Sequence, residues 1–231
     1  MEEQFLASHR FYKRSRIKQK LFIFLIYISL AVFLIGAIIL IAIFKIVWPL
    51  FILPFLMITV ASFADAPSGK LSGSLIYYSP FFIATKPRKG KVILHAGTPF
   101  DYYFVFRRKD RGIKARKEVL TQFLRGMIRF IDDLPKEEIT VEGTSYFFNE
   151  RTARRLGFDI KPAGMDQVII LGFNFLPLML TYSFTKGKPG FPDLNHIKKG
   201  SISSKKLVLQ RDKIERLLNG IQHGGTETRG I

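Results

Sequence analysis

Residues 21–44 read LFIFLIYISLAVFLIGAIILIAIF, a run of 24 residues without a formal charge. As a helix the run extends roughly 36 Å, which is longer than the roughly 30 Å hydrocarbon core of a bilayer. A secretory signal peptide is the competing interpretation, but its apolar core spans only about 7–15 residues. The run therefore predicts a membrane-spanning helix, and the rest of the chain is interpreted outward from it.

A second uncharged run follows at once, over residues 46–64 (IVWPLFILPFLMITVASFA). Its 19 residues are just enough for a span, and Pro54 should kink the helix. The very short connection predicts an antiparallel transmembrane hairpin over residues 21–65. We expect Lys45 and Trp48 at the far membrane interface, since lysine extends its amine outward and the indole prefers the headgroup level. A single span followed by a re-entrant or interfacial segment is the alternative.

The charge of the chain lies on the two sides of this apolar region. Residues 1–20 carry six Lys and Arg against two Glu, and residues 70–231 carry 29 against 15 acidic residues. The net charge of the whole chain is +18. Because basic flanks stay on the cytoplasmic side, we expect both termini in the cytoplasm, in an integral protein of the bacterial inner membrane. The predicted division is a basic N-terminal segment (1–20), the hairpin (21–65), a cytoplasmic domain (66–222) and a flexible tail (223–231).

The cytoplasmic domain is predicted to be α+β, with a mainly antiparallel sheet. Its clearest element is a long amphipathic helix over residues 112–134, where Leu120, Leu124 and Ile131 mark an apolar stripe. A linker is expected at residues 66–69. The other expected elements are strands at 74–85 (broken at Pro80), 91–95, 102–107, 138–142, 168–173 and 205–210, and helices at 150–156 and 212–221.

A third apolar stretch, residues 168–184, contains 17 uncharged residues that include Asn174 and Pro177. A third span would export residues 185–231, which hold ten Lys and Arg against four acidic residues. That placement conflicts with the positive-inside rule. We therefore expect a segment that packs in the domain or lies on the membrane surface.

Few residues are candidates for chemistry. His95 and Asp101 flank a Gly-Thr-Pro turn in the stretch HAGTPFD and come nearest to a general acid–base pair. The competing interpretation is that Asp101 only caps the turn. The chain has no cysteine, and it shows neither ligand-spaced histidines nor a Gly-rich phosphate loop. We therefore predict no metal and no cofactor.

Clusters of basic residues are the strongest functional signal. Attraction to the anionic inner leaflet, binding of an acidic protein or an anionic lipid-linked substrate, and nucleic-acid binding compete as explanations. No helix-turn-helix or RNP-like signature supports nucleic acid as a partner. The connection Gly143-Thr144-Ser145, with Asn149 at a helix start and arginines nearby, could also hold an anion, or it is an ordinary strand-to-helix connection. The predicted anion- or lipid-binding residues are Arg107, Arg108, Lys109, Arg111, Arg151, Arg154 and Arg155.

The leading hypothesis is a non-enzymatic, membrane-anchored accessory protein, whose basic domain docks on anionic lipid or on a protein partner in a membrane complex. The alternative is an enzyme that acts on a lipid-linked phosphate at the cytoplasmic face. In that case His95 and Asp101 would serve as acid and base, and the arginines of residues 151–155 would hold the phosphate.

Overall fold

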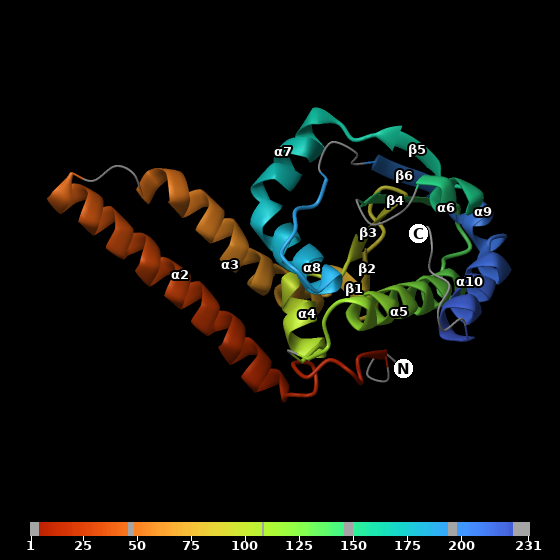
Figure 1. Cartoon of the computed structure of the whole chain (residues 1–231), viewed down its shortest axis with the longest axis horizontal. Coiled ribbons are helices and arrows are strands. Elements are labelled where there is room, and N and C mark those ends of the chain that lie inside the picture. The colour runs from red at the N-terminus through yellow and green to blue at the C-terminus, as the bar shows by residue number, and fades with distance from the viewer. Residues whose placement is uncertain (1–4, 46–48, 108, 146–149, 194–197, 224–231) are drawn as a thin grey trace.

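The apolar run forms one continuous helix, α2 (Arg16–Phe44), with many large apolar side chains exposed along it. The computed structural model describes residues 5–45, 49–107, 109–145, 150–193 and 198–223, and α2 extends from an α+β domain as a long arm (Figure 1). Among these residues Arg16–Ile43 is the one helix long and apolar enough to cross a membrane, and its most apolar window is 11% buried. Because the core helix of a soluble protein is mostly covered, such low burial favours a membrane environment.

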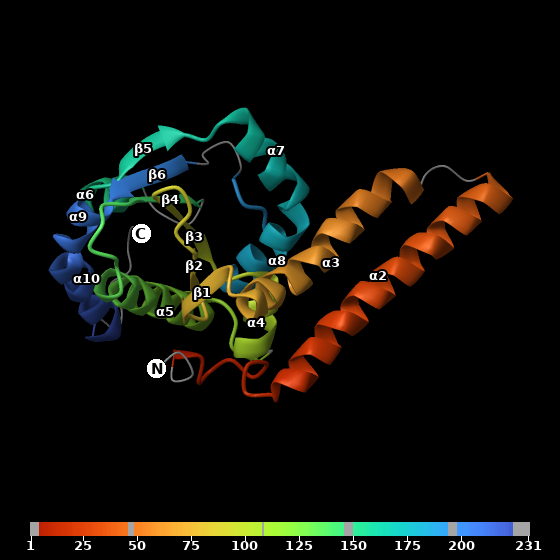
Figure 2. The ribbon, with the colours of Figure 1, turned by 180° about the vertical axis from the view of Figure 1, so that it is seen from behind.

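α3 (Pro49–Ser72) runs antiparallel beside α2 (Figures 1 and 2). The described residues show no second candidate span, so a transmembrane α3 remains a prediction. Pro54 lies inside the helix, as expected. The linker expected at residues 66–69 is wrong, because α3 continues through it. Ala66 is buried in an apolar cluster with Phe11 and Phe100, and this packing supports the helix beyond the apolar run.

A six-stranded mixed sheet forms the centre of the domain, with strand order β1-β2-β3-β4-β6-β5. The β3–β4 pair is parallel and the other neighbouring pairs are antiparallel. Two helices, α4 and α5, separate β3 from β4 along the chain, and such a crossover permits parallel pairing. The α+β class is thus confirmed, with a mixed sheet. The strands are β1 (Leu75–Ser79), β2 (Phe82–Thr85), β3 (Lys91–Ala96), β4 (Thr140–Ser145), β5 (Asp159–Pro162) and β6 (Lys198–Ser203).

α5 (Ile113–Asp132) confirms the predicted long amphipathic helix and packs against β1 and β2. Its Met127 and Phe130 share the main core with Phe82 of β2. Gly126 permits this approach, because a Cβ at that position would collide with Phe82. α9 (Ser204–Val208) and α10 (Arg211–His223) pack on α5, and Ile214 of α10 is fully buried.

The strand predicted at residues 102–107 is wrong, because these residues belong mainly to the helix α4 (Pro99–Val105). Thr98 and Asp101 form a capping box there, and Pro99 takes the first helical position. The alternating aromatic residues that resemble a strand serve two separate clusters. Phe100 and Phe104, four residues apart, face one cluster, and Tyr102 and Phe106 face the other.

Two further predicted strands are also wrong. Residues 168–173 lie in the helix α7 (Met165–Phe173), since a short apolar run fits a buried strand and a helix equally well. Residues 205–210 fall largely in α9, which begins where the Ser203 side chain accepts a hydrogen bond from the Lys206 N–H. The strand predicted at 138–142 does exist, as β4, but begins at Thr140.

The remaining helices lie near the predicted places. α6 (Glu150–Arg155) confirms the short helix, and Gly157 leaves it with a φ of 82°. The apolar stretch 168–184 is divided at Asn174 into α7 and α8 (Phe175–Lys186). α8 packs against α3, α4 and α5, in keeping with a segment packed in the domain. Residues 224–231 lie outside the described part of the chain, so the flexible tail remains a prediction.

Candidate anion-binding cleft

Asp101 is fully buried at the third position of α4, where its carboxylate accepts four hydrogen bonds. Oδ2 accepts from the Thr98 backbone N–H at 2.7 Å and from the Thr98 hydroxyl at 2.9 Å. Oδ1 accepts from the Tyr77 hydroxyl and from Nε2 of His9, each at 3.2 Å. The capping interpretation of Asp101 is therefore confirmed, and the contacts assign the carboxylate to structure.

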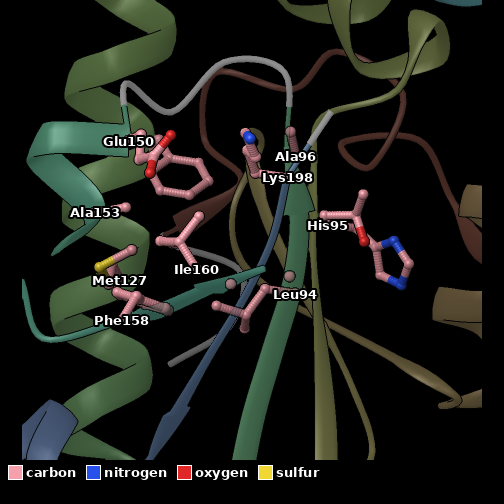
Figure 3. A pocket seen from close by; sticks show the side chains of 13 residues that line it. Leu94, His95, Ala96, Met127, Glu150, Ala153, Phe158, Ile160 and Lys198 are labelled. Atoms are coloured by element: carbon pink, nitrogen blue, oxygen red, sulfur yellow. The ribbon is translucent and has the colours of Figure 1, made fainter. Parts of the chain in front are cut away.

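His95 lies on β3 with its side chain exposed. Its ring points away from the side of the sheet where Leu94 and Met127 lie (Figure 3). The four hydrogen bonds to the Asp101 carboxylate come from three residues, Thr98, Tyr77 and His9, so the described contacts do not join His95 to Asp101. The pairing proposed from their spacing gains no support from these contacts.

His9 is the histidine that pairs with Asp101, and the sequence holds no signal for this pairing because 92 residues separate the two. The segment around it packs closely, with Leu6 and Phe11 buried. Burial, together with the negative charge of Asp101, raises the pKa of both Tyr12 and Tyr77 above the ordinary value near 10. His9, Tyr77 and Asp101 are closed to solvent, and the cluster attaches the N-terminal segment to α4 and β1.

The predicted basic residues lie in two separate places. Arg151, Arg154 and Arg155 are exposed on α6, where Arg154 forms an ion pair with Glu150 at 2.8 Å. Arg107, Lys109 and Arg111 are exposed between α4 and α5, and Figure 1 shows α6 across the domain from α4. Arg108 lies outside the described residues. The two groups therefore cannot act on one ligand.

A cavity of about 740 Å³ lies beside the second group. It is bounded by α4, by α8 and the loop after it, by Arg10 of the N-terminal segment and by Phe63 of α3. We call it the basic cleft. The described residues that line it include no acidic side chain. Its cations are Arg10, Arg107, Arg111 and Lys188, and its apolar and aromatic walls include Tyr102, Tyr103, Phe106, Leu180 and Phe184.

The cations of the basic cleft have little competition from carboxylates. Arg10 donates to the backbone carbonyls of Tyr103, Phe104 and Phe106 at 2.6–2.9 Å, which satisfies the open end of α4. The Arg111 guanidinium lies 5.9 Å from the centroid of the Phe184 ring. The neighbouring acid, Asp110, instead pairs with Lys114 at 2.7 Å, which lowers the pKa of its carboxyl.

Two glycines bring the basic segments together. Gly112 precedes α5 and Gly187 follows α8, both with positive φ, at 70° and 75°. The Gly112 N–H donates to the Phe184 carbonyl at 3.0 Å, and a Cβ on Gly187 would lie 3.0 Å from the Gly112 Cα. Arg111 and Lys188, each adjacent to one of these glycines, thereby reach the same cleft.

Sequence reasoning found half of the cations in this cleft. Arg107 and Arg111 were predicted as anion-binding residues, whereas Arg10 and Lys188 were not. The basic N-terminal segment contained a signal for Arg10, but its closeness to α4 depends on the fold. Lys188 follows α8 in a stretch without any distinguishing pattern.

A second cavity lies between the sheet and α5 and α6, near Leu94, Met127, Phe158 and Ile160 (Figure 3). Its volume is about 70 Å³, which suits a few water molecules rather than a small-molecule ligand. Within the described residues no group of three or more His, Asp and Glu could hold a metal ion. No protein-family model matches the chain, and no match to a curated protein or to a solved structure was found.

Proposed function

We propose that this chain is an integral membrane protein whose cytoplasmic domain docks on the anionic inner leaflet through the basic cleft, as an accessory subunit of a membrane complex. The observation that carries the proposal is the gathering of Arg10, Arg107, Arg111 and Lys188 in a cleft that α3 borders and that contains no described carboxylate. The cleft thus lies where the helical arm joins the domain (Figure 1).

Phosphate is the chemical group that this cleft fits best. A guanidinium donates two parallel hydrogen bonds to phosphate oxygens, and a lysine adds a point charge. Each cation near an anionic leaflet contributes about 1 kcal/mol of attraction. Because the arm holds the domain at the membrane, little further entropy is lost on docking. Tyr103, a residue that is 66% exposed, supplies an aromatic ring of the type found at headgroup level.

The proposed topology has α2 and α3 as a transmembrane hairpin, with both termini in the cytoplasm of a bacterial cell. Lys45 ends α2 with an exposed side chain, which suits the far interface proposed for it. Trp48, proposed for the same interface, lies outside the described residues. The basic N-terminal segment and the basic cleft then lie on one side of the membrane, as the positive-inside rule requires.

Among the residues that the structure describes, no specific contact favours the alternative of catalysis on a lipid-linked phosphate. Asp101 is fully buried and satisfied by Thr98, Tyr77 and His9, so it is closed to a substrate. α6, which carries the arginines of residues 151–155, lies across the domain from α4, which borders the basic cleft (Figure 1). Docking on lipid requires none of these groups, and a protein partner could bind the same domain in addition.

The test is lipid binding by the full-length chain in mild detergent, titrated with phosphatidylglycerol or phosphatidylcholine and followed by native mass spectrometry. We expect preferential and salt-sensitive binding of phosphatidylglycerol. The double variant Arg107→Glu and Arg111→Glu should weaken it at least tenfold, since two attractions become repulsions.

The matched control is Arg151→Glu with Arg155→Glu, which changes the net charge equally but lies on α6. It should leave phosphatidylglycerol binding within about twofold, because its sites lie beyond direct contact with the cleft. Equal loss in both double variants would contradict the cleft and indicate a response to net charge alone. Equal binding of the two lipids by the unmodified chain would overturn the proposal.

A further inference from the structure

We propose that α7 lies in the boundary between headgroups and acyl chains of the same leaflet, with its exposed apolar face inserted among the chains. The inference rests on the proposed membrane anchoring and adds a third point of contact to the arm and the basic cleft. We call this face the apolar shelf. It consists of Met165, Ile169, Ile170 and Phe173 of α7 and Leu180 of α8, with 76, 53, 59, 43 and 48% of each residue exposed.

The four shelf residues of α7 share one face of that helix. Met165, Ile169 and Phe173 follow one another at intervals of four residues, and Ile170 lies three before Phe173. No formal charge occurs from residue 167 to residue 185. Soluble surfaces rarely collect so many large apolar side chains in one stretch, so a face of this kind indicates a partner surface.

The position of α7 indicates that the apolar shelf contacts the bilayer. α7 packs on α8, and α8 packs in turn on α3, the helix that runs beside α2. Figures 1 and 2 both show α7 and α8 on the side of the domain from which the arm extends. A bilayer that contains α2 therefore lies on the side of the domain that carries the two helices of the shelf.

On this side of the domain an apolar surface lies next to a cationic one, as acyl chains lie next to phosphates in an anionic leaflet. Leu180 belongs to the apolar shelf and also lines the basic cleft, so an apolar surface continues directly into a cationic one. Interfacial helices bury their apolar side roughly 5–10 Å into the boundary region while neighbouring cations meet the phosphates. An acidic protein partner would fit the cleft but not the shelf, whereas an anionic leaflet fits both.

The length of α2 is consistent with this arrangement. Its uncharged run is roughly 36 Å long, and a bilayer core of roughly 30 Å accommodates the excess when the helix tilts. A tilted arm lowers one side of the attached domain toward the membrane. A tilt toward the side of α7 and α8 brings their exposed faces to the membrane surface, and this is the direction that the inference requires.

The experiment uses the absence of cysteine from the chain, which allows single labels. Ile169→Cys carries an environment-sensitive nitrobenzoxadiazole label on the full-length protein in phosphatidylglycerol-containing liposomes. Val32→Cys, 64% exposed on α2, reports the membrane interior. Leu209→Cys, 76% exposed between α9 and α10, is an equally apolar control across the domain from the arm (Figure 1).

We expect the label at residue 169 to be quenched most by lipids brominated near the headgroup, the label at residue 32 most by lipids brominated near the chain end, and the label at residue 209 by neither. Quenching at residue 32 without quenching at residue 169 would overturn the inference and leave the membrane anchor intact. Equal depth at residues 32 and 169 would also overturn it, in favour of a third span. No quenching at residue 32 would refute the membrane anchor itself, and the inference with it.

Discussion

The buried carboxylate of Asp101 makes the sharpest prediction about how the N-terminal segment is held. Replacement by alanine removes the acceptor of four hydrogen bonds, three from Thr98 and Tyr77 within the domain and one from His9. Of these four bonds, only the one from His9 joins the N-terminal segment to α4. The loss of protection in the N-terminal segment can therefore be measured apart from the loss of stability of the whole domain.

The magnitudes follow from the type of bond lost. A hydrogen bond to a charged group contributes about 1.5–3 kcal/mol, and about 1.4 kcal/mol corresponds to a factor of ten. Amide hydrogen exchange of residues 5–14 should therefore accelerate about 10- to 150-fold in Asp101→Ala. The donors left in the domain are buried or partly buried, so its global stability should also fall, by about 3–5 kcal/mol.

The assay is hydrogen exchange with mass spectrometry on the full-length chain in detergent. The Arg10 N–H, which donates to the Phe104 carbonyl at 3.2 Å, is one of the protected amides. His9→Leu removes the bond between the segment and Asp101 and the ring contacts of His9 with Phe100 and Phe104, but it leaves the bonds from Thr98 and Tyr77 in place. It should therefore reproduce the local acceleration with a smaller loss of stability. Asp110→Ala is the matched control, because its carboxylate pairs with exposed Lys114 instead. If residues 5–14 exchange no faster in Asp101→Ala and His9→Leu than in Asp110→Ala, the reasoning is refuted.

Three further predictions concern packing and pH. Gly126→Ala should lower stability by about 1–3 kcal/mol, because the new Cβ would collide with Phe82 and lie 2.8 Å from the Ser79 hydroxyl. Gly220→Ala places its Cβ in open space on a helix and should raise stability by up to about 1 kcal/mol. Thermal unfolding that ranks the two variants in the opposite order would contradict the packing. Gly187→Ala should lower stability and weaken phosphatidylglycerol binding, because the positive φ at residue 187 and the nearby Gly112 backbone both oppose a side chain. Unchanged lipid binding would show that the contact between Gly112 and Gly187 is not needed to form the basic cleft. The hydrogen bond and charge of Lys199 lower the pKa of Glu142, so this pair stabilises the folded state above the ordinary pKa of 4.5, and the stabilisation is lost as the pH falls through the lowered pKa. Denaturation at pH 7 and at pH 3.5 should therefore show that Glu142→Gln loses less stability on acidification than the unmodified chain does. Equal losses in the two proteins would refute the pairing.

The elements that the sequence predicted well are those whose pattern is long. α2 follows from an uncharged run of 24 residues, and α5 follows from an apolar stripe that is sustained over 20 residues. The elements predicted wrongly are short. α4 has seven residues, and its aromatic alternation fits a strand until the capping box of Thr98 and Asp101 is considered. The stretch from His95 to Asp101, which suggested an acid–base pair, includes both residues of that capping box.

The cations of the basic cleft also fall into two classes, those that the sequence predicts and those that only the fold brings there. Arg107 and Arg111 belong to a cluster of charge that is visible along the chain, so composition was enough to propose them. Arg10 and Lys188 join them only because the N-terminal segment returns to α4 and because Gly112 and Gly187 cross. Neither contact has a local sequence pattern, since its partners are far apart in the chain.

The sequence alone determined the arm, the basic character of its flanks and the α+β composition of the domain, because each depends on local hydrophobicity and charge. Only the tertiary structure decided that Asp101 pairs with His9, that four cations face one cleft, and that the apolar residues of α7 and α8 lie on the arm side. These are long-range contacts, and their energy comes from burial and from hydrogen bonds between segments that are not neighbours in sequence. A local pattern can supply the residues for such a surface, but the packing of the sheet against α4, α5 and α8 decides which of them meet.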